Sequence, residues 1–248
     1  MMSPVPRRLL AFVFAAVIAG ALRAVPAAAA GKPGYPNTIV WSGHTWQVKS
    51  SQSKVGPGPN YFSASTDNVS VGADGRLHLR ITYRNGRWSC AEIISAESFG
   101  YGTYSFDVGS AVAALDPGVV LGLFTWSDKA AYNHREIDVE FARWGNATDP
   151  TNAQYVVQPY SAAGHLVRWT LPSGAASSTH DFTWHAGRVD FASVFDPAGG
   201  SNLWTYAGSD VPKPGGENVR LNLWLHGGAA PTDGQDVEVV INGFGFAP

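Results

Sequence analysis

Apolar and polar residues alternate along much of the chain, and no sustained helical periodicity follows residue 30. The alternation is regular over residues 77–83, 104–108, 219–225 and 237–241. Side chains that alternate in this way point to opposite faces of a β-strand. Glycine, proline and asparagine groups separate the runs and indicate turns. Many short strands at close spacing predict an all-β sandwich, with a short helix most expected at residues 128–133.

The first thirty residues have a different pattern. Two arginines precede an unbroken apolar run over residues 9–22, and an alanine-rich stretch ends at Ala30. This arrangement is typical of a secretory signal peptide, and the run is too short to span a bilayer comfortably. A retained signal anchor is the alternative. We expect residues 1–30 to be cleaved, leaving a secreted, membrane-free single domain over residues 31–248, because no low-complexity linker divides that range.

Composition and charge exclude several classes of protein. Hydrophobic residues make up 45% of the chain and charged residues 15%, which excludes a disordered protein. The formal net charge of −2 gives no basic face for nucleic acid. The single cysteine, Cys90, excludes an internal disulfide framework and a multi-cysteine zinc site. We expect Cys90 to be a buried, inert thiol.

One predicted strand carries three acids. Residues 135–141 read R-E-I-D-V-E-F, so Glu136, Asp138 and Glu140 point to one face and the apolar residues between them to the other. A solvated face, a calcium site and a catalytic site are the three interpretations that this pattern leaves open. Like charges at neighbouring positions of one face repel, so folding alone gains nothing from them.

Sugar hydrolysis uses such a set of acids. One carboxylate attacks the anomeric carbon, while a second, protonated carboxyl group donates to the leaving oxygen. On the concave side of a bent sheet, two glutamates at positions i and i+4 can lean toward each other. Asp138 between them can orient Glu136, and its charge helps to keep Glu140 protonated.

Several motifs then match a known family in order. The chain resembles glycoside hydrolase family 16, the β-jelly-roll endo-glycanases, and most of all the branch of lichenases and xyloglucan-active enzymes, whose signature is E-I-D-x-E-F. The matching segments are C-A-E at 90–92, F-G-Y-G-T-Y at 99–104, L-F-T-W at 123–126, E-I-D-V-E-F at 136–141, T-H-D-F-T-W at 179–184 and N-L-W at 222–224.

The resemblance implies a fold and an activity. The fold is a β-jelly-roll sandwich of two antiparallel sheets with a concave glycan-binding cleft. Glu136 is implied as the nucleophile, Asp138 as the assisting carboxylate and Glu140 as the general acid and base. The activity is that of a secreted, retaining endo-β-glycanase acting on β-glucan or a related wall polysaccharide. A transglycosylase of the same family and a non-catalytic, lectin-like glycan-binding module are the alternatives.

Seven further residues are candidates for substrate binding. Tryptophans can stack on a sugar ring, although a tryptophan in a sandwich is often core, as we expect for Trp184. Glu92 has two interpretations, a sugar contact, which we favour, or a pair with a buried arginine. The candidates are Asn60, Glu92, Trp126, Trp144, Gln158, Asn222 and Trp224.

The sequence also departs from the lichenase pattern. Ile94 stands where lichenases have an arginine that contacts the sugar, His134 stands where they have a tryptophan, and Cys90 has no partner. Substrate preference therefore cannot be copied from lichenases. We expect a monomer that binds a polysaccharide and needs no cofactor or metal in catalysis. Relatives carry a structural calcium ion on the convex side, and the sequence leaves that site open.

Overall fold

The computed structural model describes residues 35–248, so the predicted signal peptide lies outside the described residues. Almost all regular structure in this part is strand, and three short 3-10 helices lie at Val112–Ala114, Asn133–Arg135 and His226–Gly228. The strands are β1 (Asn37–Trp41), β2 (His44–Val48), β3 (Val69–Val71), β4 (Leu77–Arg84), β5 (Arg87–Ser89), β6 (Ala91–Ser95), β7 (Gly102–Val108), β8 (Val119–Trp126), β9 (Ile137–Phe141), β10 (Ala153–Val157), β11 (Leu166–Trp169), β12 (Ser177–His185), β13 (Arg188–Asp196), β14 (Ser201–Tyr206), β15 (Asn218–Leu225) and β16 (Val237–Ala247).

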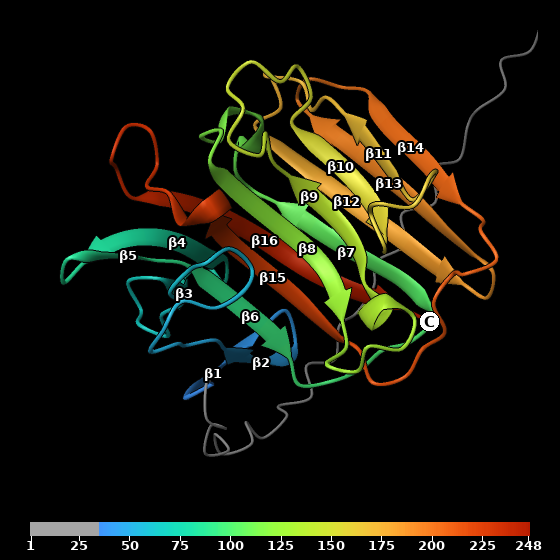
Figure 1. Cartoon of the computed structure of the whole chain (residues 1–248), viewed down its shortest axis with the longest axis horizontal. Coiled ribbons are helices and arrows are strands. Elements are labelled where there is room, and N and C mark those ends of the chain that lie inside the picture. Colours follow the sequence, from blue (N-terminus) through green and yellow to red (C-terminus); the bar gives the residue numbers. More distant parts are fainter. Residues whose placement is uncertain (1–34) are drawn as a thin grey trace, which may run out of the picture.

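The strands form two antiparallel sheets that stack face to face (Figure 1). The first sheet has the order β1-β2-β6-β15-β8-β9-β10-β11. The second has the order β14-β13-β12-β7-β16-β4-β3, and β5 pairs with β4. Some neighbours, such as β8 and β9, follow each other in the sequence, but others, such as β6 and β15, are far apart, so the sandwich forms only when distant segments pair. The predicted sandwich of two antiparallel sheets is confirmed.

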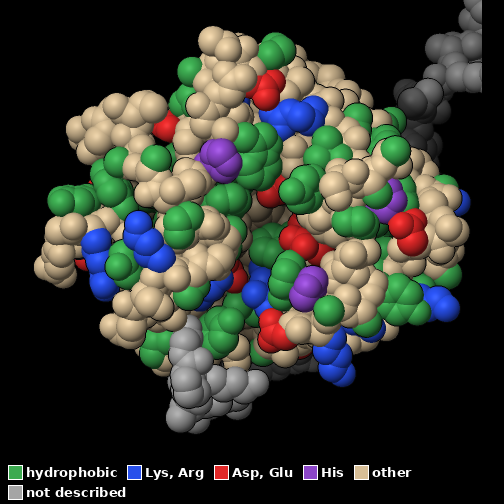
Figure 2. All heavy atoms as spheres, viewed as in Figure 1, with side chains coloured by type: hydrophobic (Ala, Val, Ile, Leu, Met, Phe, Trp, Pro, Cys, Tyr) green, Lys and Arg blue, Asp and Glu red, His purple; other side chains and the backbone are tan. Residues whose placement is uncertain are grey.

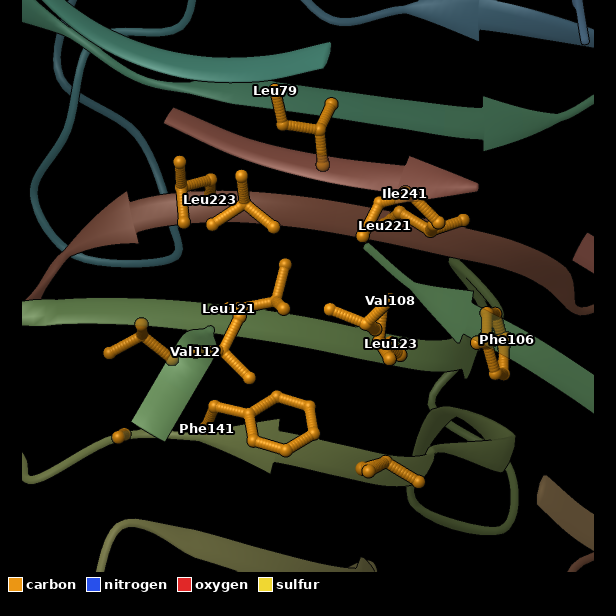
Figure 3. Packing of buried hydrophobic residues seen from close by; sticks show 14 of the residues in the cluster. Leu79, Phe106, Val108, Val112, Leu121, Leu123, Phe141, Leu221, Leu223 and Ile241 are labelled. Carbon is orange, nitrogen blue, oxygen red and sulfur yellow. The ribbon is translucent and has the colours of Figure 1, made fainter. Parts of the chain in front are cut away.

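Alternating apolar residues from both sheets form the core between them. Leu121, Leu221 and Phe141 come from the first sheet, and Leu79 and Phe106 come from the second (Figure 3). All five are at most 1% exposed. Because successive side chains of a strand point to opposite faces, burying one set turns the set between them outward. The outward set of the first sheet is the one that carries the predicted chemistry.

The four alternating runs correspond to β4, β7, β15 and β16. Asn85 and Gly86 both have positive φ and form the two-residue turn between β4 and β5.

The helix predicted at residues 128–133 is wrong. The chain bends there without helical hydrogen bonds, and the 3-10 helix starts only at Asn133. Among residues 35–248, none of the helices has the length and hydropathy needed to cross a membrane.

Candidate active site

A cleft of about 370 Å³ opens on the outer face of the first sheet. Figure 2 shows the hollow near the centre of this face, with acidic and basic side chains at its floor. The lining comes from the middle strands of the sheet and from the loop before β3. The lining residues are Lys49, Gly56, Pro57, Glu92, Gly122, Phe124, Trp126, Glu136, Asp138, Glu140, Arg220, Asn222 and Trp224.

Strand register brings the polar lining residues into rows. Residues directly opposite each other on antiparallel strands share a face. One row therefore crosses the sheet from Glu92 through Asn222, Gly122 and Glu140 to Gln154. A methyl group at position 122 would lie 2.6 Å from Asn222 Oδ1, so glycine leaves the room that the asparagine side chain occupies.

The three predicted acids lie together in this cleft. Asp138 and Glu140 lie on β9, and Glu136 directly precedes that strand. Asp138 is 3% exposed, and the two glutamates are partly buried. The alternation that predicted a shared face therefore holds, because Ile137, Val139 and Phe141 fill the core behind them.

Burial raises the pKa of all three carboxyl groups. Removal from water disfavours the charged form and is the largest cause in each case. The charge of Glu140 raises the pKa of Glu136 further, and both glutamates raise that of Asp138. Glu136 and Asp138 also share a hydrogen bond. Three acids this close share protons as one unit, so the cluster retains protons at pH values where separate carboxyl groups would have lost them.

Gln154 fixes which oxygen of Glu140 accepts a hydrogen bond. Its Oε1 accepts from the Trp144 indole N–H at 3.2 Å and from an N–H of Arg168 at 2.9 Å, and both partners can only donate. Its Nε2 must therefore donate to Glu140 Oε2, at 2.6 Å. Any proton that Glu140 carries is then placed on the other oxygen, Oε1.

Gln158 acts on Asp138 in the same way. Its Oε1 accepts from the backbone N–H of Tyr160 at 2.8 Å, so its Nε2 donates to Asp138 Oδ2 at 3.2 Å. The remaining oxygen of Asp138 is left for the hydrogen bond with Glu136. Gln158 was predicted to bind substrate, but the structure places it beside Asp138, outside the residues that line the cleft.

Glu92 and two cations form the wall of the cleft across from the three acids. Its Oε2 lies 2.8 Å from Lys49 Nζ, and its Oε1 lies 3.4 Å from an N–H nitrogen of Arg220. Glu92 itself is 1% exposed. The structure shows the pair with a buried arginine, and because Glu92 also lines the cleft, the sugar contact stays a prediction. Sequence reasoning missed Lys49 and Arg220, although the alternation placed Arg220 on the same face as Asn222.

The predicted aromatic residues have different positions. Trp224 and Trp126 line the cleft. The His134 imidazole stacks flat on Trp126, with ring centres 4.2 Å apart and planes 7° apart, which covers one face of that tryptophan. Trp144 lies beside Trp224 and donates to Gln154, outside the lining. Trp184 is fully buried, as expected for a core residue.

Three other predictions concern single residues in or near the cleft sheet. Asn60 is 3% exposed, and its amide donates to the carbonyls of Pro57 and Leu225, so it fixes a turn under the cleft rim and is absent from the lining. Asn222 lines the cleft, and its Oδ1 is buried with no partner among residues 35–248. Cys90 is fully buried, and burial raises the pKa of its thiol to about 12.

A strained turn leads into the acidic strand. Four consecutive residues, Tyr132 to Arg135, have φ between 50° and 62°, a region that costs non-glycine residues energy. Arg135 is 8% exposed and donates from Nε to the carbonyl of Lys213 at 2.8 Å. The turn brings His134 onto Trp126 and Glu136 to the cleft. Strain of this kind at a cleft is typical of functional sites.

Metal binding has no support in the described part of the chain. Among residues 35–248, His, Cys, Asp and Glu side chains form no group of three or more with the arrangement of a metal site. What the cleft offers is a cluster of carboxyl groups with raised pKa, two cations paired with a buried glutamate, and aromatic surface.

Comparison with solved structures shows the same fold. The beta-glucanase of Bacillus licheniformis aligns with a TM-score of 0.60 at 22% identity, over 82% of this chain and 92% of that protein. A beta-1,3-glucanase from Mycobacterium marinum aligns with a TM-score of 0.59 at 19% identity, over 79% and 88% of the two chains.

Sequence comparison gives the family. A beta-glucanase of Paenibacillus polymyxa is 26% identical over 162 residues, which cover 64% of this chain and 62% of the relative. The chain thus spans less than two thirds of the length of this relative. The model of glycosyl hydrolases family 16 matches residues 59–235, which include every residue of the cleft except Lys49, Gly56 and Pro57. The chain belongs to glycosyl hydrolases family 16.

Proposed function

We propose that the protein is a retaining endo-β-glycanase that hydrolyses β-glucan or a related wall polysaccharide through a glycosyl-enzyme intermediate. Membership of the family and the beta-glucanases among its relatives support the class of substrate and reaction. The observation that carries the proposal is the set of three partly or fully buried carboxyl groups with raised pKa on one face of the cleft.

In the first step, Glu140 donates its proton to the glycosidic oxygen, and the bond from that oxygen to the anomeric carbon breaks. The carboxylate of Glu136 attacks the anomeric carbon from the other face and forms the glycosyl-enzyme. Placement of the Glu140 proton on Oε1 supports this role, because Oε2 is already occupied by Gln154. Asp138 holds Glu136 through their shared hydrogen bond.

In the second step, Glu140 has lost its proton and acts as a base. It takes a proton from a water molecule, whose oxygen attacks the anomeric carbon and releases Glu136. Two displacements at one carbon restore the starting configuration. We propose the side chains of this chain as the only reacting groups, with no cofactor in either step.

The cleft supports a neutral glycan as the substrate. Trp224, Phe124 and the free part of Trp126 offer apolar surface for the C–H faces of sugar rings, and Asn222 offers a polar partner for hydroxyl groups. We further propose that the protein is exported after cleavage of residues 1–30 and works as a monomer. N-terminal sequencing of the exported protein and light scattering test these two points.

The test of the activity is reducing-end release from a panel of polymers by the protein comprising residues 31–248. The panel is mixed-linkage glucan, laminarin, xyloglucan, chitosan and agarose. We expect release from at least one polymer, and loss of release in Glu136→Gln with an unchanged folded state. Unchanged activity in that variant would overturn the assignment of Glu136. Longer products formed from oligosaccharides would indicate transglycosylation, and binding without turnover would indicate a lectin-like module.

The roles of the two glutamates can be separated by rescue with azide. With an activated β-glycoside, Glu136→Ala should form the α-glycosyl azide, because azide replaces the nucleophile in a single displacement. Glu140→Ala should form the β-glycosyl azide, because azide replaces the water of the second step. The opposite pattern of products would exchange the two assignments.

A further inference from the structure

Arg220 lines the cleft but has no part in the mechanism above. It lies on β15, and its side chain is 10% exposed. Strand register places it opposite Ile94 of β6 on one side and opposite Phe124 of β8 on the other. Burial of an arginine at this depth requires partners for its N–H groups.

Not every N–H group of Arg220 has a hydrogen-bond acceptor. One terminal nitrogen lies 3.4 Å from Glu92 Oε1, and the other lies 3.2 Å from Asp128 Oδ1. The Nε–H is buried and finds no acceptor among residues 35–248. Two positions along the same strand face, the Oδ1 of Asn222 is buried and equally unpartnered. Both atoms are closed off from the cleft, so the donors that a ligand can reach are the second N–H groups of the two terminal nitrogens, which the contacts with Glu92 and Asp128 do not use.

The charges around Arg220 select the chemistry of that ligand. Lys49 and Arg220 carry two positive charges, and Glu92 and Asp128 carry two negative charges. The charges of this wall therefore sum to zero before a ligand binds, and an anionic sugar gains little electrostatic attraction from them. Neutral hydroxyl groups fit the remaining terminal N–H groups, because an arginine N–H can donate to a hydroxyl oxygen.

The distance across the sheet fits one sugar ring. Arg220, Phe124 and Asp138 stand opposite one another on β15, β8 and β9. Adjacent strands are about 4.8 Å apart, so the guanidinium strand and the acidic strand are separated by roughly 10 Å. A ring that rests on Phe124 would have the carboxyl groups on one side and Arg220 on the other.

We propose that Arg220 binds substrate, donating from its terminal N–H groups to the hydroxyl groups of the neutral sugar that lies over Phe124. Glu92 and Asp128 orient the guanidinium. This inference rests on the proposed glycanase function and adds to it the residue that selects neutral hydroxyl-bearing rings.

The first experiment measures binding apart from turnover. Calorimetry with a mixed-linkage β-glucotetraose measures Kd in the Glu136→Gln variant, which binds without cleaving. Initial rates on the polymer that the unmodified protein cleaves measure KM and kcat in the active protein. Arg220→Met keeps the length of the side chain but removes the donors. We expect Kd and KM to rise by about tenfold to a hundredfold, the range of a lost hydrogen bond to a charged group. Arg80→Met, on β4 outside the cleft, is the matched control and should change neither.

Two further variants distinguish a loss of substrate binding from a loss of folding. Arg220→Met leaves Glu92 with Lys49 alone, so its thermal unfolding is measured first. Arg220→Lys retains the charge without the planar fork and should bind with an affinity between those of the unmodified protein and Arg220→Met. The exchange variant Ile94→Arg/Arg220→Ile returns a guanidinium to the facing position and should recover part of the lost affinity. If Arg220→Met does not fold, these two variants decide the question.

The outcomes separate the inference from the function. A folded Arg220→Met or Arg220→Lys whose Kd and KM stay within about twofold of the unmodified protein would overturn the inference. A fall in kcat alone, with a shifted pH profile, would also overturn it, because Arg220 would then act through Glu136. If the unmodified protein cleaves no polymer and the Glu136→Gln protein binds none, the proposed function itself fails.

Discussion

Gln154 illustrates how one buried amide sets the chemistry of its neighbour. Trp144 and Arg168 can only donate, so they fix the amide, and the amide then fixes Glu140 Oε2 as an acceptor. This hydrogen bond favours the charged form of Glu140, as does the charge of Arg168. Burial acts in the opposite direction and is larger, which keeps the pKa of Glu140 above its ordinary value.

Gln154→Leu removes the donor to Glu140. Because that donor stabilises the carboxylate, its loss should raise the pKa of Glu140 further, so the acid stays protonated to higher pH. We expect the basic limb of the profile of kcat/KM against pH to move to higher pH, measured by initial rates on the cleaved polymer. Gln235→Leu, in an exposed turn, is the control. A basic limb that stays in place or moves down would contradict this role of Gln154.

Glu136→Gln should stabilise the fold while it removes activity. The folded-state pKa of Glu136 lies above its ordinary value, so the folded protein holds the proton of Glu136 more tightly than the unfolded chain does. The free energy of unfolding therefore falls as pH rises through the folded-state pKa. Replacing the carboxyl group by an amide removes this cost. At pH 8 we expect the free energy of unfolding to rise by about 1 kcal/mol, with a smaller gain at pH 4. Urea denaturation at the two pH values measures it, and an equal or larger gain at pH 4 would contradict the assigned cause.

At the scale of elements, the link between β8 and β9 decides where the acids lie. The alternation of residues 136–141 predicted the strand and its faces, and the structure confirms both. The left-handed turn before it was not predicted, because Tyr132, Asn133, His134 and Arg135 have no glycine among them to indicate positive φ. Anchoring of Arg135 by the carbonyl of Lys213, far along the chain, supports the turn.

Asn133 offers a test of that strain, because its side chain is exposed. Asn133→Val should destabilise the fold by about 1–2 kcal/mol, since a β-branched residue tolerates positive φ poorly. Asn133→Gly at the same position should stay within about 1 kcal/mol of the unmodified protein. Chemical denaturation compares the two variants, and kcat shows whether the valine variant displaces Glu136. Equal stabilities would show that the turn carries no strain.

At the scale of the whole molecule, a polar network joins the two sheets within the core. His180 of β12 is fully buried and contacts Ser193 and Ser178 at 2.7 Å each, and Tyr155 of β10 donates to Ser193 at 2.5 Å. Burial lowers the pKa of His180 to about 3, so the imidazole is neutral in the folded protein at neutral pH. Hydrogen bonds between the two sheets thus stabilise the sandwich in addition to apolar packing.

This network predicts acid sensitivity of the fold. In the unfolded chain the histidine titrates near 6.5, so below that pH the unfolded state binds a proton that the folded state does not. His180 therefore lowers stability as pH falls from about 6.5 toward 3. Between pH 6.5 and 4.5 we expect His180→Gln to reduce the loss of unfolding free energy by about 2–3 kcal/mol. His185→Gln, at a partly exposed histidine, is the control, and an unchanged slope in His180→Gln would contradict the assignment.

The sequence by itself determined the class of fold, the face of the acidic strand and the family, because alternation and local motifs are properties of neighbouring residues. It also placed Trp184 in the core and Cys90 out of solvent. Only the tertiary structure decided that Glu92 pairs with Arg220, that Asn60 and Gln158 support the cleft without lining it, and that Arg220 faces the acids across β8. Those contacts join residues as far apart in the sequence as Asn60 and Leu225, and their register depends on how the two sheets pack.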